Sequence, residues 1–379
     1  MEREIDSDRV GEPSPRLRLV DTMNHAANVA TRAAHLDAGA ALQPEYDSSS
    51  WWKTVLVLDY NGRGIKSFIA PFVFINVVSA AWTCAYELAL PKRDADLDAF
   101  DVVYTLVFTT MGFLLVFRLS RAAVRFWDCR TAFGNINVGV RSLVDVALVY
   151  GEGRDPEAMD DLCAWSCAFA SATKQYLRGL KTIDPAEVVG ILSEDDRARV
   201  ERSSHPPLYC LAMTRRAIFR AFGRDATSDS VNDTMRLESR VRELHTHIDT
   251  LVLQEGALER LRATKLPQIY VMHLRTFVCA YCVSLPFVFV SRWRWGTIIA
   301  VFVVSFALLG IEGGATECEI PFNATHSNHL RMDQYVKGCF DSVSCLLKWN
   351  ARREGMKSLG HREGNVSYTD LTIQVDKSH

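Results

Sequence analysis

The hydrophobic residues of the chain are concentrated in four stretches, which fall into two pairs. The first, Ser67–Leu90, contains one charged residue, Glu87, and as a helix it is long enough to cross the roughly 30 Å hydrocarbon core of a bilayer. The other three are near the lower limit of about 17 residues for a spanning helix, so each alone also fits a buried core helix. They are Val102–Phe117, Thr276–Ser291 and Trp295–Ile311. Because arginines at their ends can extend to the membrane surface, the four stretches together favour two transmembrane hairpins.

The distribution of Lys and Arg predicts how these hairpins are oriented, because basic residues are retained on the cytoplasmic side of a membrane. Basic residues are frequent before the first stretch, after the second and before the third. The connections within the two pairs carry only Lys92, Arg93, Arg292 and Arg294. Both termini and the middle of the chain are therefore expected on the cytoplasmic or a topologically equivalent side.

Between the two hairpins, residues 126–264 show helical periodicity. In the clearest helix, steps of four and three residues separate the apolar positions, and Glu255 occupies one position where an apolar residue is expected. The apolar residues are Leu237, Val241, Leu244, Ile248, Leu251 and Leu258. We find no long strand-like alternation. The predicted fold is all-α: a multi-pass membrane protein with four transmembrane helices in two hairpins and a cytosolic helical bundle.

The same pattern divides the chain into five segments. Residues 1–50 begin with acidic residues and contain no apolar run of secretory-signal length, so we predict a disordered tail. The first hairpin occupies residues 51–125, and the cytosolic helical region occupies residues 126–264. The second hairpin follows at residues 265–322, and residues 323–379 form a cytosolic C-terminal segment and tail.

Composition excludes several classes of function. The formal net charge of -2 provides no footprint for nucleic acid, which is therefore not expected as a partner. The ten cysteines are not spaced as a metal or disulfide framework. His245, His247 and Asp249 do not converge on one ion, because alternate positions of a helix point about 200° apart. No phosphate-binding loop, nucleophile elbow or catalytic pair of carboxylates is found, so no enzymatic activity, metal or cofactor is expected.

The second stretch contains a regular stripe of residues. Thr109, Phe113 and Phe117 recur every four residues, and Arg121 and Arg125 continue the series. Because four residues exceed one helical turn by about 40°, only three neighbouring members share a face. The spacing fits an ordinary contact between helices. It equally fits a constriction in which aromatic rings from several copies present their positive edges to a passing anion.

Arg118, Arg121 and Arg125 are spaced i, i+3 and i+7, which places them on one side of the same helix. One interpretation is that they meet a permeating anion at the cytoplasmic mouth of a pore. The alternative is that they bind lipid phosphates or acidic side chains such as Asp128. The spacing leaves both open.

Residues 117–130 read FRLSRAAVRFWDCR and resemble the FR(x)6RWWExR signature of the bestrophin family of anion channels, with Trp127 and Asp128 inside it. The third stretch and the end of the fourth also resemble this family, the latter its GIEE…IExPFG ending. The matching residues are Pro267, Tyr270, His273, Tyr281, Leu285, Pro286 and Phe287, then Gly310, Ile311, Glu312, Glu317, Glu319, Pro321 and Phe322. Trp51 and Trp52 resemble the segment before the first span. The resemblance covers roughly residues 50 to 340.

This resemblance implies a homopentamer whose five second helices surround one anion pore with a hydrophobic neck. Counted back from the arginine and aromatic pair of the signature, the neck positions of the family fall on Thr109, Phe113 and Phe117, which is the stripe found from spacing. The expected function is the pore-forming subunit of a passive channel for chloride. Bicarbonate is a second candidate ion, because photosynthetic relatives are associated with inorganic-carbon uptake. A coupled anion transporter and a non-conducting regulatory membrane protein are the alternatives, and the plasma membrane and the plastid thylakoid are both open as locations.

The chain departs from the family pattern at two places. Thr109 replaces the usual apolar residue at the first neck position, which predicts a wetter and less selective ring. Animal members bind calcium at an acidic cluster after the Pro-Phe of the ending, because a hard cation needs several oxygen ligands. The corresponding residues 323–333 contain one carboxylate, Asp333, so we expect no calcium site of the animal kind.

Overall fold

The computed structural model describes residues 19–29, 65–89, 98–223, 231–323 and 329–362. Within these residues the chain is helical and contains no β-strand beyond one isolated bridge. It divides into two compact units. The membrane unit comprises Ala34–Phe133 and Gly256–Met332, and the helical unit comprises Met1–Ala33, Gly134–Glu255 and Asp333–His379. Trp51 and Trp52 lie outside the described residues.

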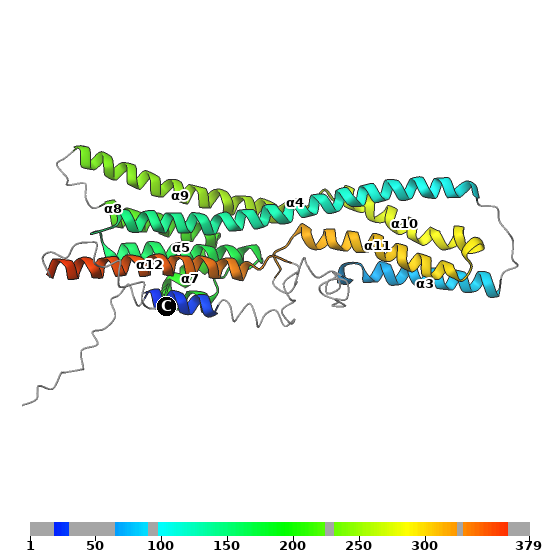
Figure 1. Cartoon of the computed structure of the whole chain (residues 1–379), viewed down its shortest axis with the longest axis horizontal. Helices are drawn as coiled ribbons and strands as arrows, with labels where there is room; N and C mark the ends of the chain where they lie inside the picture. Colours follow the sequence, from blue (N-terminus) through cyan, green and yellow to red (C-terminus); the bar gives the residue numbers. More distant parts are fainter. Residues whose placement is uncertain (1–18, 30–64, 90–97, 224–230, 324–328, 363–379) are drawn as a thin grey trace, which may run out of the picture. The chain divides into compact units, whose positions relative to one another are not determined.

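Among the described residues, four helices are long and apolar enough to span a bilayer, which agrees with the four-span prediction. They are α3 (Ile69–Leu88), α4 (Asp98–Tyr150), α10 (Gln268–Trp293) and α11 (Gly296–Glu319), and a 3₁₀ turn, η1 (Ile65–Ser67), precedes α3. Within the membrane unit, α3, α10 and α11 pack against one another (Figure 1). The helices α10 and α11 follow one another almost directly, as expected for the second hairpin.

The core of the membrane unit is built from one face of each of these helices. It includes Ile75 of α3, Met111 and Leu115 of α4, Val278 of α10 and Val301 of α11, all of them buried. The opposite faces expose large apolar side chains. That distribution is expected where lipid or another subunit replaces water around the helices.

The helical unit is organised around α5 (Pro156–Leu177), which is buried along most of its length and packs on α8 (Pro206–Phe222). Two short helices, α6 (Pro185–Val188) and α7 (Glu194–Arg202), lie between them in sequence. The Asp155, Asp184 and Ser193 side chains accept hydrogen bonds from backbone N–H groups at the starts of α5, α6 and α7, which explains why the helices begin there.

Two long helices complete this part of the fold. The helix α9 (Val231–Ala263) follows the predicted periodicity of four and three, since Leu244, Ile248 and Leu251 are fully buried and Glu255 is nearly so. The helix α12 (Met332–Arg362) occupies much of the predicted C-terminal segment. The helical character predicted for residues 126–264 is therefore confirmed where the structure describes them.

The predicted disordered tail requires a correction at residues 19–29, which form a helix. Its apolar positions Val20, Met23 and Ala27 are buried, and the Asn24 side chain accepts a hydrogen bond from Ser344 of α12 at 2.7 Å. The acidic residues at the start of the chain therefore do not predict the structure of this segment, because its apolar side chains recur at helical spacing. The boundary placed between residues 125 and 126 falls inside the continuous helix α4.

Candidate functional site

The aromatic stripe lies on α4 and is exposed in the single chain. The Phe113 side chain is 65% exposed and Phe117 is 47% exposed, although both belong to a membrane-spanning stretch. Their rings meet edge to face with centroids 4.6 Å apart. Thr109 is also exposed, one turn earlier. The three predicted neck residues therefore share a face of α4 that the core of the chain does not cover.

The Thr109 hydroxyl is used within its own helix. Its Oγ1 donates a hydrogen bond to the Thr105 carbonyl at 2.8 Å. A hydroxyl turned back in this way offers its lone pairs and methyl group to the surroundings, but not its hydrogen. Those lone pairs can still accept hydrogen bonds from water, so the wetter ring expected from the sequence stays a prediction.

Arg118 requires a correction, because its guanidinium does not face outward as a pore-mouth residue would. The side chain is fully buried. Its Nε donates to Glu312 at 3.3 Å and its Nη2 donates to Glu319 at 2.8 Å, both on α11. Of the two interpretations that spacing left open, internal ion pairing holds for this arginine.

The two carboxylates that hold Arg118 also bind other parts of the membrane unit. The second oxygen of Glu312 accepts from Arg275 Nε of α10 at 2.8 Å, and the second oxygen of Glu319 accepts from the Leu266 N–H at 3.0 Å. These contacts join the pore helix candidate α4 to α10 and α11. The sequence resemblance singled out Glu312 and Glu319 without indicating their partners, and it gave no sign of Arg275.

Arg125 is half-buried and likewise forms hydrogen bonds within the chain. Its Nη2 donates to the Leu261 carbonyl at 2.6 Å, and its Nε donates to the Glu319 carbonyl at 3.3 Å. By contrast, Arg121 and the signature residues Trp127 and Asp128 are exposed on α4. Arg121 is thus the member of the arginine group whose position fits the predicted pore mouth.

The remaining motif residues lie in or beside α10 and α11. Pro267 precedes the first residue of α10, where a missing N–H costs nothing, and Pro286 is buried inside that helix. His273 is exposed and its ring lies 5.1 Å from that of Phe277. Pro321 and Phe322 are buried just after α11.

Asp333, the one carboxylate of the segment compared with the calcium site of animal relatives, is held by two basic side chains. Arg178 Nη2 donates to its Oδ2 at 2.6 Å, and Lys174 Nζ donates to its Oδ1 at 3.0 Å. Burial raises the pKa of Asp333, but the hydrogen bonds and positive charges of Arg178 and Lys174 outweigh burial and lower that pKa below its ordinary value. The absence of a calcium site stays a prediction, and residues 324–328 lie outside the described residues.

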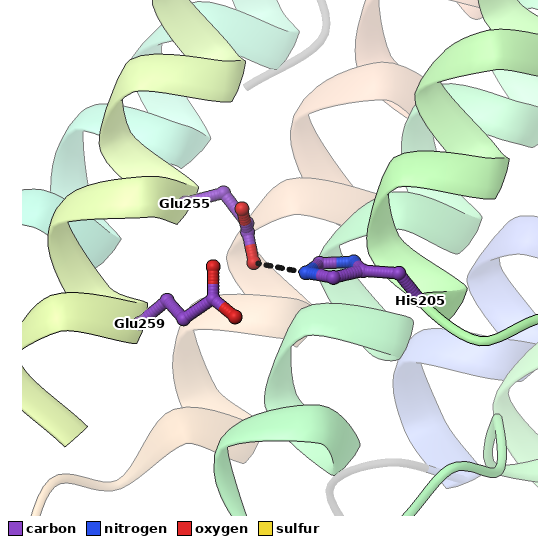
Figure 2. A group of neighbouring side chains, drawn as sticks. All are labelled: His205, Glu255 and Glu259. Carbon is purple, nitrogen blue, oxygen red and sulfur yellow. Dashed lines mark ion pairs between the residues drawn. The ribbon is translucent and has the colours of Figure 1, made fainter. Parts of the chain in front are cut away.

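The helical unit also contains a histidine beside a buried carboxylate. His205 Nε2 lies 3.6 Å from Glu255, and Figure 2 shows this pair together with Glu259, one turn further along α9. His205 Nδ1 accepts a hydrogen bond from the Leu208 N–H at 3.4 Å, so the ring proton is placed on Nε2, facing Glu255. A histidine that binds a metal instead donates its other ring N–H to an acceptor. This geometry favours a helix cap whose Nε2–H faces Glu255 over a metal ligand.

Comparison with known proteins gives consistent matches. A family model described as bacterial/fungal bestrophin protein matches residues 45–344. A voltage-dependent anion channel-forming protein of Synechocystis sp. is 31% identical, over 66% of this chain and 75% of its own length. The voltage-dependent chloride channel 2, chloroplastic, of Arabidopsis thaliana is 24% identical, over 69% of this chain and 62% of its own length.

Solved structures show the same fold. The crystal structure of a bacterial bestrophin homologue from Klebsiella pneumoniae superimposes with a TM-score of 0.62 at 22% identity. The match covers 74% of this chain and 98% of that one. The helical membrane architecture is therefore shared along nearly the whole length of that protein.

Proposed function

Because the chain belongs to the bestrophin family, as the match over residues 45–344 shows, we propose that it is the pore-forming subunit of a homopentameric anion channel. Its relatives in Synechocystis and Arabidopsis carry the names of anion and chloride channels, which supports this class of function over an enzyme. Transport is passive. Five copies of α4 surround the pore, and each contributes Thr109, Phe113 and Phe117 to a narrow neck.

The observation that carries this proposal is the exposure of Phe113 and Phe117 opposite a buried face of the same helix. Met111 and Leu115 of α4 pack into the core of the subunit, while the two phenylalanine rings do not. Repeating α4 around a symmetry axis gives these rings a common place to meet. Their hydrogen-bearing edges are positive, so a ring of such edges favours an anion that has lost part of its water.

The electrostatics of α4 support the same assignment. Arg121 is exposed one turn beyond Phe117, towards the cytoplasmic side predicted from the basic residues. Five copies of this cation concentrate anions at the end of the neck. Chloride is the default ion, and bicarbonate is the second candidate because it too is monovalent.

Replacement of the neck phenylalanines tests this function. In Phe113→Ala and Phe117→Ala, the dry constriction widens and hydrates, so single-channel conductance rises and discrimination among anions falls. The matched control is Phe74→Ala, which removes an equally large exposed ring from α3. Conductance and relative permeability are measured in planar bilayers.

The outcomes separate the classes of function. If the neck assignment is right, conductance and relative permeability change in the two α4 variants and not in the α3 control. Unchanged currents in all three variants would contradict the neck assignment. Silent bilayers from verified wild-type oligomers would instead favour a coupled transporter or a non-conducting regulatory protein.

A further inference from the structure

The buried face of α4 contains one charged residue among apolar ones. Met111, Leu115, Arg118 and Ala122 follow steps of four, three and four residues, and all are buried. Such spacing defines a single helix face packed on a core. Burying a guanidinium on that face is costly unless its hydrogen-bonding groups and its charge are matched.

The charge and two of the three nitrogens are matched from two turns of one helix, whereas Nη1 is buried without a hydrogen-bond partner among the described residues. Glu312 and Glu319 are seven residues apart on α11, which places both carboxylates on the same face. Arg118 Nε reaches the first and Nη2 reaches the second. A planar guanidinium held at two points resists both rotation of α4 about its axis and sliding along α11.

The position of Arg118 dictates where the neck rings point. A helix turns by about 100° per residue, so Phe117 points about 100° from Arg118 and Phe113 about 140° from it, in the same sense. Any rotation of α4 that withdrew Arg118 from the carboxylates would carry both rings away from their exposed orientation.

We propose that Arg118 is the positioning residue of the neck: clamped by Glu312 and Glu319, it fixes the rotation of α4 and hence the direction of Phe113 and Phe117. This inference rests on the proposed channel function. It gives Arg118 a role in anion selectivity without contact with the ion, in place of a role at the pore mouth.

Other ties strengthen the clamp. Glu312 also accepts a hydrogen bond from Arg275, and Glu319 also accepts one from the Leu266 N–H. Each carboxylate is therefore positioned by a second partner besides Arg118. Arg125, two turns beyond Arg118 on α4, donates to the Glu319 carbonyl. The anchor for the neck helix is therefore rigid on the side of α10 and α11.

The test compares Arg118→Lys and Arg118→Met with the control Arg130→Met, which removes an exposed arginine from the same helix. Lysine keeps the charge but cannot donate to two carboxylates with a planar fork. The measurement is the permeability of thiocyanate relative to chloride, taken from bilayer reversal potentials of size-verified oligomers. Both Arg118 variants are expected to change this ratio several-fold, whereas Arg130→Met leaves it unchanged.

A double-mutant cycle adds a measurement that a general loss of stability would not reproduce. If Glu319 acts through Arg118, then Glu319→Gln changes the permeability ratio in wild type but has little further effect in Arg118→Lys. Independent, additive effects would overturn the proposal.

The remaining outcomes are also distinct. A wild type without anion current defeats the proposed function itself. A conducting wild type whose Arg118 variants keep the wild-type ratio defeats only the positioning role. Loss of assembly in both Arg118 variants, with Arg130→Met intact, would overturn the proposal by showing that the clamp holds the fold together and not the neck alone.

Discussion

Lys174 of α5 shows at the residue scale how this protein stabilises charge away from water. Its side chain is fully buried, and its ammonium pairs with Glu187 and with Asp333, while Asp184 lies 3.9 Å away. Ser171 donates a further hydrogen bond to Glu187. Removing Lys174 would leave Glu187 buried without its cation, although Asp333 would keep Arg178.

Replacing Lys174 with methionine is therefore expected to destabilise the protein by about 3–5 kcal/mol, as for other broken buried ion pairs. The thermal midpoint of the purified protein in detergent measures this loss. Lys181→Met is the control, because Lys181 is exposed. Equal midpoints for the two variants would show that the buried group contributes nothing to stability.

The same group of charged residues predicts that the stability of the fold depends on pH. Since the pKa of Asp333 is lowered in the folded state, its contribution to stability is present above the ordinary aspartate pKa of about 3.9 and is lost as the pH falls through the lower folded pKa. Burial raises the pKa of Glu187 more than Lys174 lowers it, so Glu187 acts in the opposite direction.

Asp333→Asn is accordingly expected to be less stable than wild type at neutral pH, with a difference that shrinks below about pH 4. Thermal midpoints across an acid series check this expectation. A difference that stayed constant down to strongly acidic pH would contradict the assignment of the lowered pKa to Asp333.

Residue-level predictions from the sequence succeeded where the local pattern determines the outcome. The spacing of Phe113 and Phe117 predicted a shared face, and the structure leaves that face exposed. The spacing of the three arginines could not predict that Arg118 is buried, because its partners Glu312 and Glu319 lie far along the chain. Whether a helical arginine faces water or carboxylates is decided by tertiary packing.

At the scale of elements, long periodic segments were predictable and short ones were not. The α9 heptad pattern predicted the buried face of that helix. Glu255 interrupts this apolar pattern, and its buried carboxylate faces His205. The helix at residues 19–29 was missed because its helical spacing of apolar residues spans only about two turns, which is too short to be stable without burial in the folded protein.

The contact between α4 and α9 gives a prediction at this scale. A Cβ added at Gly139 of α4 would lie 2.7 Å from Leu251 Cδ2 of α9, whereas a Cβ at Gly134 has nothing within 4 Å. Gly134→Ala is expected to stabilise the helix by about 0.5–1 kcal/mol. Gly139→Ala is expected to destabilise by about 1–3 kcal/mol, because Leu251 is fully buried and has little space in which to move.

The stabilities of Gly134→Ala and Gly139→Ala are compared through their thermal midpoints in the same detergent. A stabilising Gly139→Ala would show that the two helices separate without cost. A destabilising Gly134→Ala would show that this position is covered in the assembled protein.

At the scale of the whole molecule, the chain exposes apolar surface that would be covered by lipid or, in the proposed channel, by further copies of the chain. The four spans account for much of it, and the Phe113 and Phe117 face accounts for the part that the proposed pore uses. Fold and family followed from motifs in order along the chain. Subunit number and ion choice depend on contacts between copies, which no pattern within one copy determines.

The central claim is tested most directly by reconstituting the purified oligomer in planar bilayers and measuring the reversal potential under a chloride gradient. The measurement is then repeated with bicarbonate replacing chloride on one side. An anion channel gives stepwise currents that reverse near the chloride equilibrium potential, with a bicarbonate shift that ranks the two ions. Currents reversing near the cation potential, or no current from verified oligomers, would contradict it.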